Sequence, residues 1–206
     1  FGGEKQITSA IYKLTSTEES HAYYTTNHGV QAPTSSLTDA LEAQNISLQP
    51  LDLLTATIPE DCSLLIINDP ASDFASDGLA DELGQLQTYL ENGGKVLLTT
   101  SAYYETPNLD AVMAQFGLTR EPGLVVEGDA GHALYGYPYS LFPDYSTTEE
   151  STAMDGVNRS NRVMLAAAQG INIAETENVT AESLLNTSEE AYSKQNLTET
   201  STTAKE

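Results

Sequence analysis

Two short apolar runs, separated by a segment with helical spacing, constrain the fold of this chain most strongly. The first run, residues 63–67 (SLLII), ends at the turn sequence 68–70 (NDP). Such a run is typical of a strand buried on both faces. Residues 77–92 then carry four leucines at helical spacing and end in Asn-Gly-Gly, a frequent helix C-terminus. The second run, residues 95–100 (KVLLTT), completes a pattern that predicts two parallel strands joined by a helix.

The same alternation continues on both sides of this unit. We expect strands over 21–26, 46–54, 63–67, 95–100 and 123–127, and helices over 4–16, 35–45, 77–92 and 108–116. This order predicts a doubly wound α/β fold: a mostly parallel sheet with helices on both faces, in three layers. In such folds ligands bind where the strands have their carboxyl ends.

The sequence changes character after residue 128. Residues 130–145 are rich in tyrosine and contain two prolines. We expect 163–168 (VMLAAA) to return to the sheet and 182–185 (ESLL) to form a last short strand. We therefore expect a single domain over residues 1–197 and a mobile polar tail over 198–206.

Charge and composition exclude several classes of protein. The chain of 206 residues has 30 acidic and 8 basic side chains, a formal net charge of −22. Nucleic acids and anionic lipids need clustered Lys and Arg, so neither is an expected partner. The lone Cys62, placed just before its expected strand, cannot form an internal disulfide or a Cys-based zinc site. No apolar run is long enough to span a bilayer, and the start at Phe1 suggests a piece of a longer protein.

Catalytic, metal and cofactor motifs are weak. The acids Asp69, Asp73, Asp77, Asp81 and Glu82 do not fit a calcium loop, and we interpret them mainly as the solvated entry to a helix. No glycine-rich phosphate loop follows a strand, so we expect no cofactor.

The sequence also gives little support for a catalytic nucleophile. Ser101 follows a strand but lacks the flanking glycines of a nucleophile elbow. His28 lies after the first strand, where it is either a turn residue or a general base or ligand-contacting group. We therefore assign no catalytic residue and no metal ligand.

The candidate contact residues fall into two groups. The first follows the strands of the sheet and comprises Asn27, His28, Asn68, Asp69 and Ser101. The second comprises Tyr135, Tyr137 and Tyr139, which share one face if that segment is extended. Tyrosine is enriched at protein interfaces, and such a row also suits sugar rings or the cover of a thin core.

An ordered series of segments resembles a known family. In chain order these are EKQITSAIYKLTS, TTNHG, IPEDCSLLIINDPASDF, YLENGGKVLLTT and PNLDAVMAQFGL. Together they resemble the soluble domain of gliding-motility-type ABC transporter auxiliary proteins, from about residue 4 to about residue 127. A weaker likeness continues through LFPDY and ESLLNTSEEAYS to about residue 193.

The resemblance implies a membrane-anchored protein whose domain lies outside the cytoplasm, accompanies an ABC permease and ATPase, and has no assigned catalysis. It also implies a glutamine-amidotransferase-like fold without the catalytic cysteine. Relatives often have Gly-His-Gly-Glu after the first strand, but this chain has Val30 in place of the acid, which weakens a metal or acid–base role for His28. Two alternatives stay open: a carbohydrate- or wall-binding module using residues 135–145, and a degenerate hydrolase using Ser101 or His28.

Overall fold

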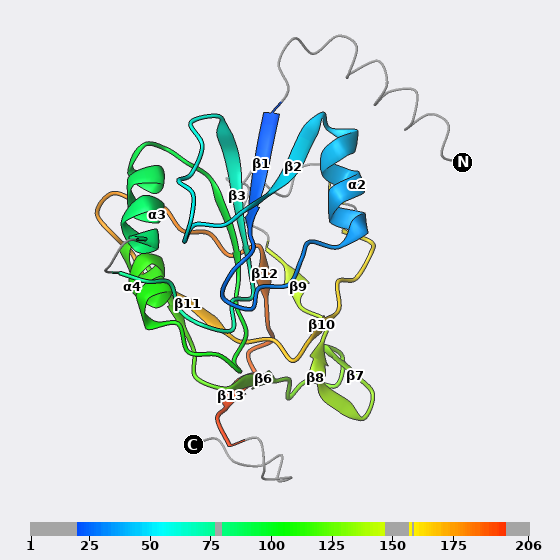
Figure 1. Cartoon of the computed structure of the whole chain (residues 1–206). Coiled ribbons are helices and arrows are strands. Elements are labelled where there is room, and N and C mark those ends of the chain that lie inside the picture. The colour runs from blue at the N-terminus through cyan, green and yellow to red at the C-terminus, as the bar shows by residue number, and fades with distance from the viewer. Residues whose placement is uncertain (1–19, 77–79, 147–156, 158, 197–206) are drawn as a thin grey trace. The chain divides into compact units, whose positions relative to one another are not determined.

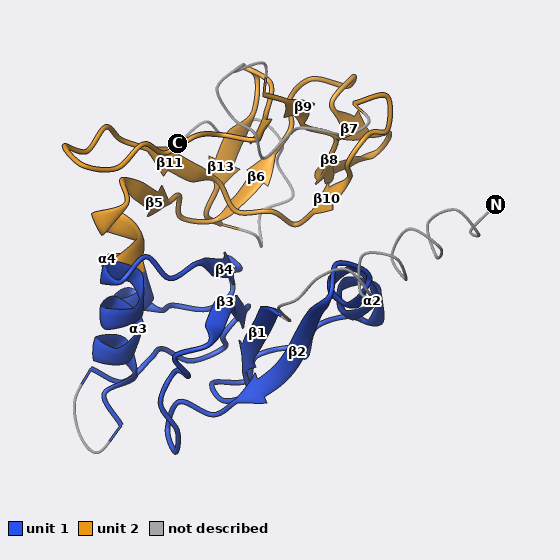
Figure 2. Ribbon diagram, turned by 90° about the horizontal axis from the view of Figure 1, so that it is seen from above, with its two compact units in different colours: residues 1–109 blue, residues 110–206 orange. Residues whose placement is uncertain are grey.

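The computed structural model describes residues 20–76, 80–146, 157 and 159–196 (Figure 1). The chain divides into two compact units, unit 1 over residues 1–109 and unit 2 over residues 110–206 (Figure 2). The expected helix over 4–16 and the expected tail over 198–206 lie outside the described residues. The prediction of a single domain over 1–197 stays a prediction.

Unit 1 is built on one parallel sheet. Its strands are β1 (Ser20–Thr25), β2 (Ile46–Leu51), β3 (Cys62–Asn68) and β4 (Val96–Thr99), in the spatial order β2-β1-β3-β4. Helix α2 (Ser35–Ala43) connects β1 to β2, and helix α3 (Glu82–Glu91) connects β3 to β4. With helix α4 (Pro107–Gln115), this confirms the predicted order of strand, helix, strand, strand, helix, strand, helix.

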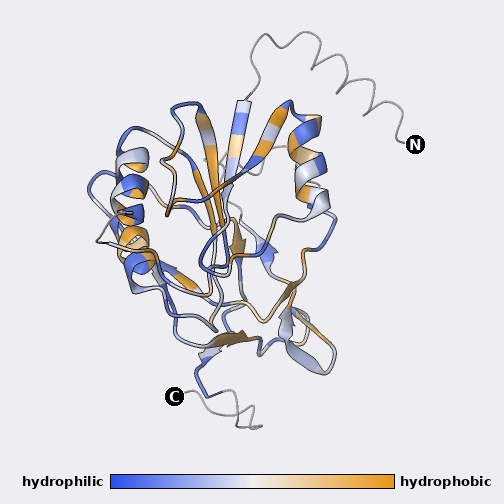
Figure 3. Ribbon diagram, in the orientation of Figure 1, coloured by the Kyte–Doolittle hydropathy of each residue, from blue (hydrophilic) through white to orange (hydrophobic). Residues whose placement is uncertain are grey.

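The apolar run of β3 forms the centre of this sheet. Leu65, Ile66 and Ile67 are buried, and β3 pairs with β1 on one side and β4 on the other. Figure 3 shows β3 as one of the most hydrophobic segments of unit 1. Leu86 of α3 and Phe74 add buried side chains, so the run predicted as a doubly covered strand does form the core.

Helix α3 begins later than predicted. Its first residue is Glu82, because the side chain of Asp81 accepts a hydrogen bond from the amide of Gly84 (2.9 Å) and caps the helix there. The expected start at residue 77 is therefore wrong; residues 77–79 lie outside the described part. Helix α2 is capped in the same way by Thr34, whose hydroxyl accepts from the Leu37 amide (3.4 Å).

Cys62 also differs from the sequence interpretation. It is the first residue of β3 rather than a residue before the strand, and it is buried at the amino end of the sheet. Burial raises the pKa of its thiol, with a partly opposing hydrogen bond to Tyr89. The thiol is therefore poorly suited to nucleophilic chemistry.

Unit 2 consists of short strands in antiparallel pairs. Strand β5 pairs with β11, β6 with β13, β9 with β12, and β8 with both β7 and β10. Their bounds are β5 (Leu118–Arg120), β6 (Leu124–Val126), β7 (Ala133–Leu134), β8 (Tyr137–Leu141), β9 (Asp144–Tyr145), β10 (Leu165–Ala166), β11 (Ile171–Ile173), β12 (Leu185–Asn186) and β13 (Tyr192–Lys194).

These pairings correct the prediction for the second half of the chain. Strands were expected near 123–127, 163–168 and 182–185, and β6, β10 and β12 lie there. None of them joins the parallel sheet, because each is two or three residues long and finds its partner within unit 2. The protein is therefore a mixed α/β structure with a four-stranded parallel sheet. In the described part of the chain, no helix has the length and hydrophobicity needed to cross a bilayer.

Candidate functional site

The first group of candidate residues lies at the carboxyl edge of the parallel sheet. Asn27 and His28 follow β1, Asn68 ends β3, Asp69 comes next, and Ser101 follows β4. The order β2-β1-β3-β4 changes direction between β1 and β3, so the residues after these two strands flank the switch point where ligands bind in open α/β sheets.

The two asparagines hold the loops of this edge in place. Asn68 donates its amide hydrogen to the carbonyl of Gln31 (2.9 Å) and accepts from the hydroxyl of Thr99 (2.8 Å). Asn27 donates to a carboxylate oxygen of Asp52 in the loop after β2. Both residues therefore link the ends of neighbouring strands.

His28 forms the most enclosed polar contact of the edge. Its Nε2 lies 2.8 Å from Oε1 of Glu82, and the two side chains are only 11% and 1% exposed. The other carboxylate oxygen of Glu82 accepts the amide of Ala75 (3.0 Å). The ring of Phe74 lies against the imidazole, with ring centroids 4.9 Å apart. This pair fixes the loop after β1 to the start of α3.

The backbone of His28 supports the same arrangement. His28 has a φ of 64°, in the left-handed region, and its carbonyl accepts from the amides of Ala71 (2.7 Å) and Ser72 (3.1 Å). Its Nδ1 lies 3.3 Å from Oγ of Ser72. In the tautomer in which Nε2 donates to Glu82, the lone pair of Nδ1 faces the hydroxyl of Ser72. The result is a serine, histidine and glutamate in series.

The contacts of Asp69 and Ser101 do not indicate a particular chemical role. Asp69 has a φ of 49° and donates its amide to the carbonyl of Thr99 (3.0 Å). Its carboxylate oxygen Oδ1 is buried without a hydrogen-bond partner among the described residues. Ser101 accepts the amide of Tyr103 (3.4 Å), a contact within its own loop.

The predicted solvated helix entry is only partly correct for the acidic run: Asp81 is exposed at the start of α3, whereas Glu82 is buried, and Asp77 lies outside the described residues. Glu82 is buried, Asp81 caps α3, and Asp73 accepts from the amides of Asn108 (2.7 Å) and Leu109 (3.3 Å) at the start of α4. These acids therefore position helices. Sequence reasoning missed Glu82 as the partner of His28, since 54 residues separate them.

The tyrosine segment forms a hairpin. Strands β7 and β8 are joined by Tyr135 and Gly136, and Gly136 has a φ of 78°, which glycine adopts without steric cost. Tyr135 therefore lies in the turn, 96% exposed, and the predicted row of three on one face reduces to Tyr137 and Tyr139. Tyr137 is 64% exposed, so Tyr135 and Tyr137 do not cover a core, whereas Tyr139 is half-buried.

Two carboxylates around His132 clamp the base of this hairpin. Its Nδ1 lies 2.7 Å from Asp129 and its Nε2 lies 3.0 Å from Asp144. Hydrogen bonds to Asp129, and then to Asp144, hold the pKa of His132 above its usual range. Arg162 donates to the carbonyl of Gly131 (2.7 Å) nearby. Sequence analysis had not connected these residues.

Metal binding has no support from the arrangement of ligands. Within residues 20–76, 80–146, 157 and 159–196, no group of three or more His, Cys, Asp or Glu side chains is placed to hold an ion. Both imidazole nitrogens of His132 face separate carboxylates, so that cluster does not converge on one point.

Comparisons with known proteins give no family. No family model and no curated protein matches the chain. Among solved structures, the chain is similar to PurLQS from Thermotoga maritima, with 7% sequence identity and a TM-score of 0.36, over 84% of this chain and 80% of that one. At that TM-score the similarity establishes neither a fold family nor a function.

Proposed function

We propose that this chain is the non-catalytic, extracytoplasmic domain of a membrane-anchored ABC-transporter accessory protein, and that it acts by contact with the permease and ATPase assembly. The ordered series of segments from IPEDCSLLIINDPASDF to PNLDAVMAQFGL supports the family. The observation that carries the contact role is the hairpin that presents Tyr135 and Tyr137 to solvent.

The physical case for contact rests on this hairpin. Tyr135 and Tyr137 are 96% and 64% exposed, although burying such rings is favourable. Tyrosine presents a large rigid surface and a hydrogen-bonding tip, which is why it is enriched in interfaces. The contacts of His132 with Asp129 and Asp144 fix the base of the hairpin, so the two tyrosines are held in place before a partner binds. The net charge of −22 favours a partner surface rich in Lys and Arg.

The carboxyl edge of the sheet is the second contact surface of the proposal. Asn27, His28 and Asn68 hold three loops together there, and Asp69 and Ser101 follow the same strands. The proposal includes a doubly wound, three-layer fold resembling the glutamine amidotransferases. Right-handed crossovers for the order β2-β1-β3-β4 would place α2 and α3 on opposite faces of the sheet, which supports that fold.

Co-purification of the full-length protein from native membranes tests the proposal. Wild type is expected to recover an ABC permease and ATPase in mild detergent, and Tyr135→Ala with Tyr137→Ala to recover at least tenfold less. Glu60→Ala is the control, since Glu60 is exposed in unit 1 and precedes β3, at the end of the sheet opposite the proposed contact edge. Recovery of the protein alone, or equal recovery by all variants, would contradict the contact role. Recovery of wall glycan instead would favour the carbohydrate-binding alternative.

One observation favours a second candidate, a serine hydrolase. The series Ser72, His28 and Glu82 has the roles of nucleophile, base and orienting carboxylate, with Ser72 in place of the predicted Ser101. A fluorophosphonate probe tests it. Labelling of the wild type that disappears in Ser72→Ala and in His28→Ala, but persists in Ser101→Ala, would support hydrolase chemistry, and an unlabelled folded protein would exclude it.

A further inference from the structure

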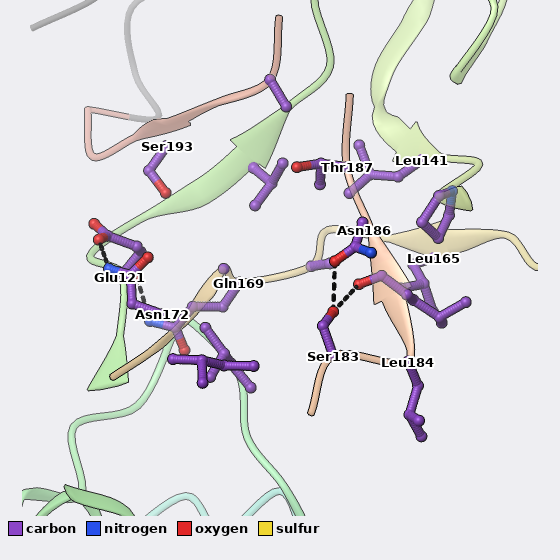
Figure 4. Close-up of a pocket in the computed structure, with 18 of the residues that line it drawn as sticks. Glu121, Leu141, Leu165, Gln169, Asn172, Ser183, Leu184, Asn186, Thr187 and Ser193 are labelled. Carbon is purple, nitrogen blue, oxygen red and sulfur yellow. Dashed lines mark hydrogen bonds between the residues drawn. The ribbon is translucent and has the colours of Figure 1, made fainter. Parts of the chain in front are cut away.

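Unit 2 contains a pocket that the proposed function does not use. Its volume is about 620 Å³, within the range of about 300–1,000 Å³ that small-molecule sites occupy. Side chains from five separate stretches line it, from residues 118–125, 141–143, 165–173, 182–187 and 191–193 (Figure 4). Strands β5, β11, β12 and β13 each contribute to the lining, so the antiparallel pairing of unit 2 helps to build the site.

Apolar side chains line both the buried inner part of the pocket and its solvent-exposed part. Val125 and Leu141 are buried, at 6% and 2% exposure, and form its inner part. Four large apolar side chains that also line the pocket are left open to solvent: Leu165, Ile171, Ile173 and Leu184, which are 36–52% exposed. Apolar side chains gathered around one concavity mark a binding site more often than isolated ones do. The apolar part of a ligand that fills the pocket would shield these four side chains from water.

The ionisable groups of the pocket all carry one sign. Glu121 and Glu182 line it, and the described lining residues include no Lys, Arg or His. Asn172 donates to one oxygen of the Glu121 carboxylate, as the dashed line in Figure 4 shows. Gln169 lines the same wall, and its Oε1 is buried without a hydrogen-bond donor among the described residues. This wall therefore has acceptors in excess, which suits a ligand that brings donors and positive charge.

We infer that this pocket binds a small amphipathic amine: an apolar body against Ile171, Ile173 and Leu184, and an ammonium group at Glu121. An ammonium supplies three donors and a positive charge, whereas a carboxylate or phosphate of the same size would meet the like charge of Glu121 and Glu182. The inference concerns the chain by itself and does not depend on its having a transporter partner.

Three probes with one apolar body test the charge preference. Octylamine, octanol and octanoate, each below its micelle concentration at pH 7, are titrated into the ¹⁵N-labelled full chain and followed by NMR. We expect saturable shifts over residues 165–187 with octylamine, weaker binding of octanol, and at least tenfold weaker binding of octanoate. Equal binding of octylamine and octanoate, or shifts outside unit 2, would overturn the assignment.

Matched variants separate the site from the general acidity of the chain. Glu121→Gln is expected to weaken octylamine at least threefold and to leave octanol unchanged, and Ile171→Ser to weaken both. Glu60→Gln and Leu54→Ser are the controls, because Glu60 and Leu54 are exposed in unit 1. If Glu60→Gln weakens octylamine as much as Glu121→Gln does, or if no probe binds saturably, the pocket is not an amine site. Neither result bears on co-purification with a transporter.

Discussion

The two units differ in how their sequence determines their structure. Unit 1 has strands of four to seven residues in one parallel sheet, and its central strand is buried. Unit 2 has strands of two to five residues in small antiparallel sheets of two or three strands, and large apolar side chains such as Ile171 stay exposed. Unit 1 thus buries the larger set of apolar side chains, whereas unit 2 combines a smaller buried set, which includes Leu124 and Leu141, with turns and charge pairs.

The two units also differ in the side chains that they present at their surfaces. Unit 1 uses its polar side chains to fix loops, as Glu82 does with His28. Unit 2 leaves tyrosines and an apolar pocket exposed. We propose that unit 1 serves as the framework and that unit 2 carries most of the recognition, and four predictions test that difference, from the largest expected effect to the smallest.

Truncation of the central strand has the largest expected effect. Leu65→Ala removes a side chain with no exposed surface from β3, and we expect it to lower the free energy of unfolding by about 3 kcal/mol. Leu165→Ala, at a residue 36% exposed in unit 2, should cost less than about 1 kcal/mol. Urea unfolding followed by circular dichroism measures both. Equal losses would remove the distinction between a core-dependent and a turn-dependent unit.

Loss of the buried carboxylate comes next. Glu82→Ala leaves the imidazole of His28 and the amide of Ala75 without their acceptor, and we expect a loss of about 2 kcal/mol in unit 1. Glu60→Ala, at an exposed acid of the same unit, should change stability by less than about 0.5 kcal/mol. Glu82→Ala as stable as Glu60→Ala would show that the pair does not hold the edge together.

Substitution of two glycines by alanine tests the left-handed turns of unit 2. At Gly117, φ is 72° and a Cβ would collide with the carbonyl oxygen of Ala174, whereas at Gly136 φ is 78° and the space is open. Gly136→Ala should cost about 1 kcal/mol for the left-handed backbone alone, and Gly117→Ala about 2 kcal/mol because strain and collision add. Thermal unfolding ranks the two variants. A smaller loss at Gly117 would contradict the close approach of Ala174.

The smallest effect is a pH dependence confined to unit 2. Because the pKa of His132 is raised on folding, its contribution to stability is fully present below its unfolded value of about 6.5 and is lost as pH rises through the folded value. The pKa of Asp129 is lowered, by the Gly131 amide and then by His132, so its contribution is lost instead as pH falls through its folded value.

NMR titration of the His132 ring protons measures the first shift directly. We expect a midpoint above that of an unfolded peptide, and a lower midpoint in Asp144→Asn, which loses one of the two carboxylates. A midpoint at or below the ordinary histidine value would mean that the clamp does not form. The Leu65→Ala variant should titrate like wild type, since His132 belongs to the other unit.

Local sequence patterns predicted unit 1 well and unit 2 poorly, for physical reasons. The run at 63–67 and the leucine spacing before Asn92 carry their own periodicity, so β3 and the end of α3 were correctly placed. In unit 2, β6 pairs with β13 and β5 with β11, which are far apart in the chain, and strands of two or three residues have no periodicity to detect.

The candidate sites follow the same rule. The carboxyl edge was predictable because every parallel strand ends there, so Asn27, His28 and Asp69 follow from the strand positions. Partners brought in by tertiary structure were not predictable: Glu82 and Ser72 for His28, and Asp144 for His132. The turn at Tyr135 was missed because Gly136 was taken as part of an extended segment.

Site-specific photo-cross-linking in native membranes tests the central claim most directly. A photoreactive phenylalanine analogue replaces Tyr137 in the full-length protein, and the control replaces Glu60, which is exposed in unit 1 at the amino end of the parallel sheet. We predict cross-links from position 137 to an ABC permease or ATPase subunit, and at least tenfold fewer from position 60. No transporter cross-link from position 137, in protein shown to be folded and membrane-embedded, would contradict the account.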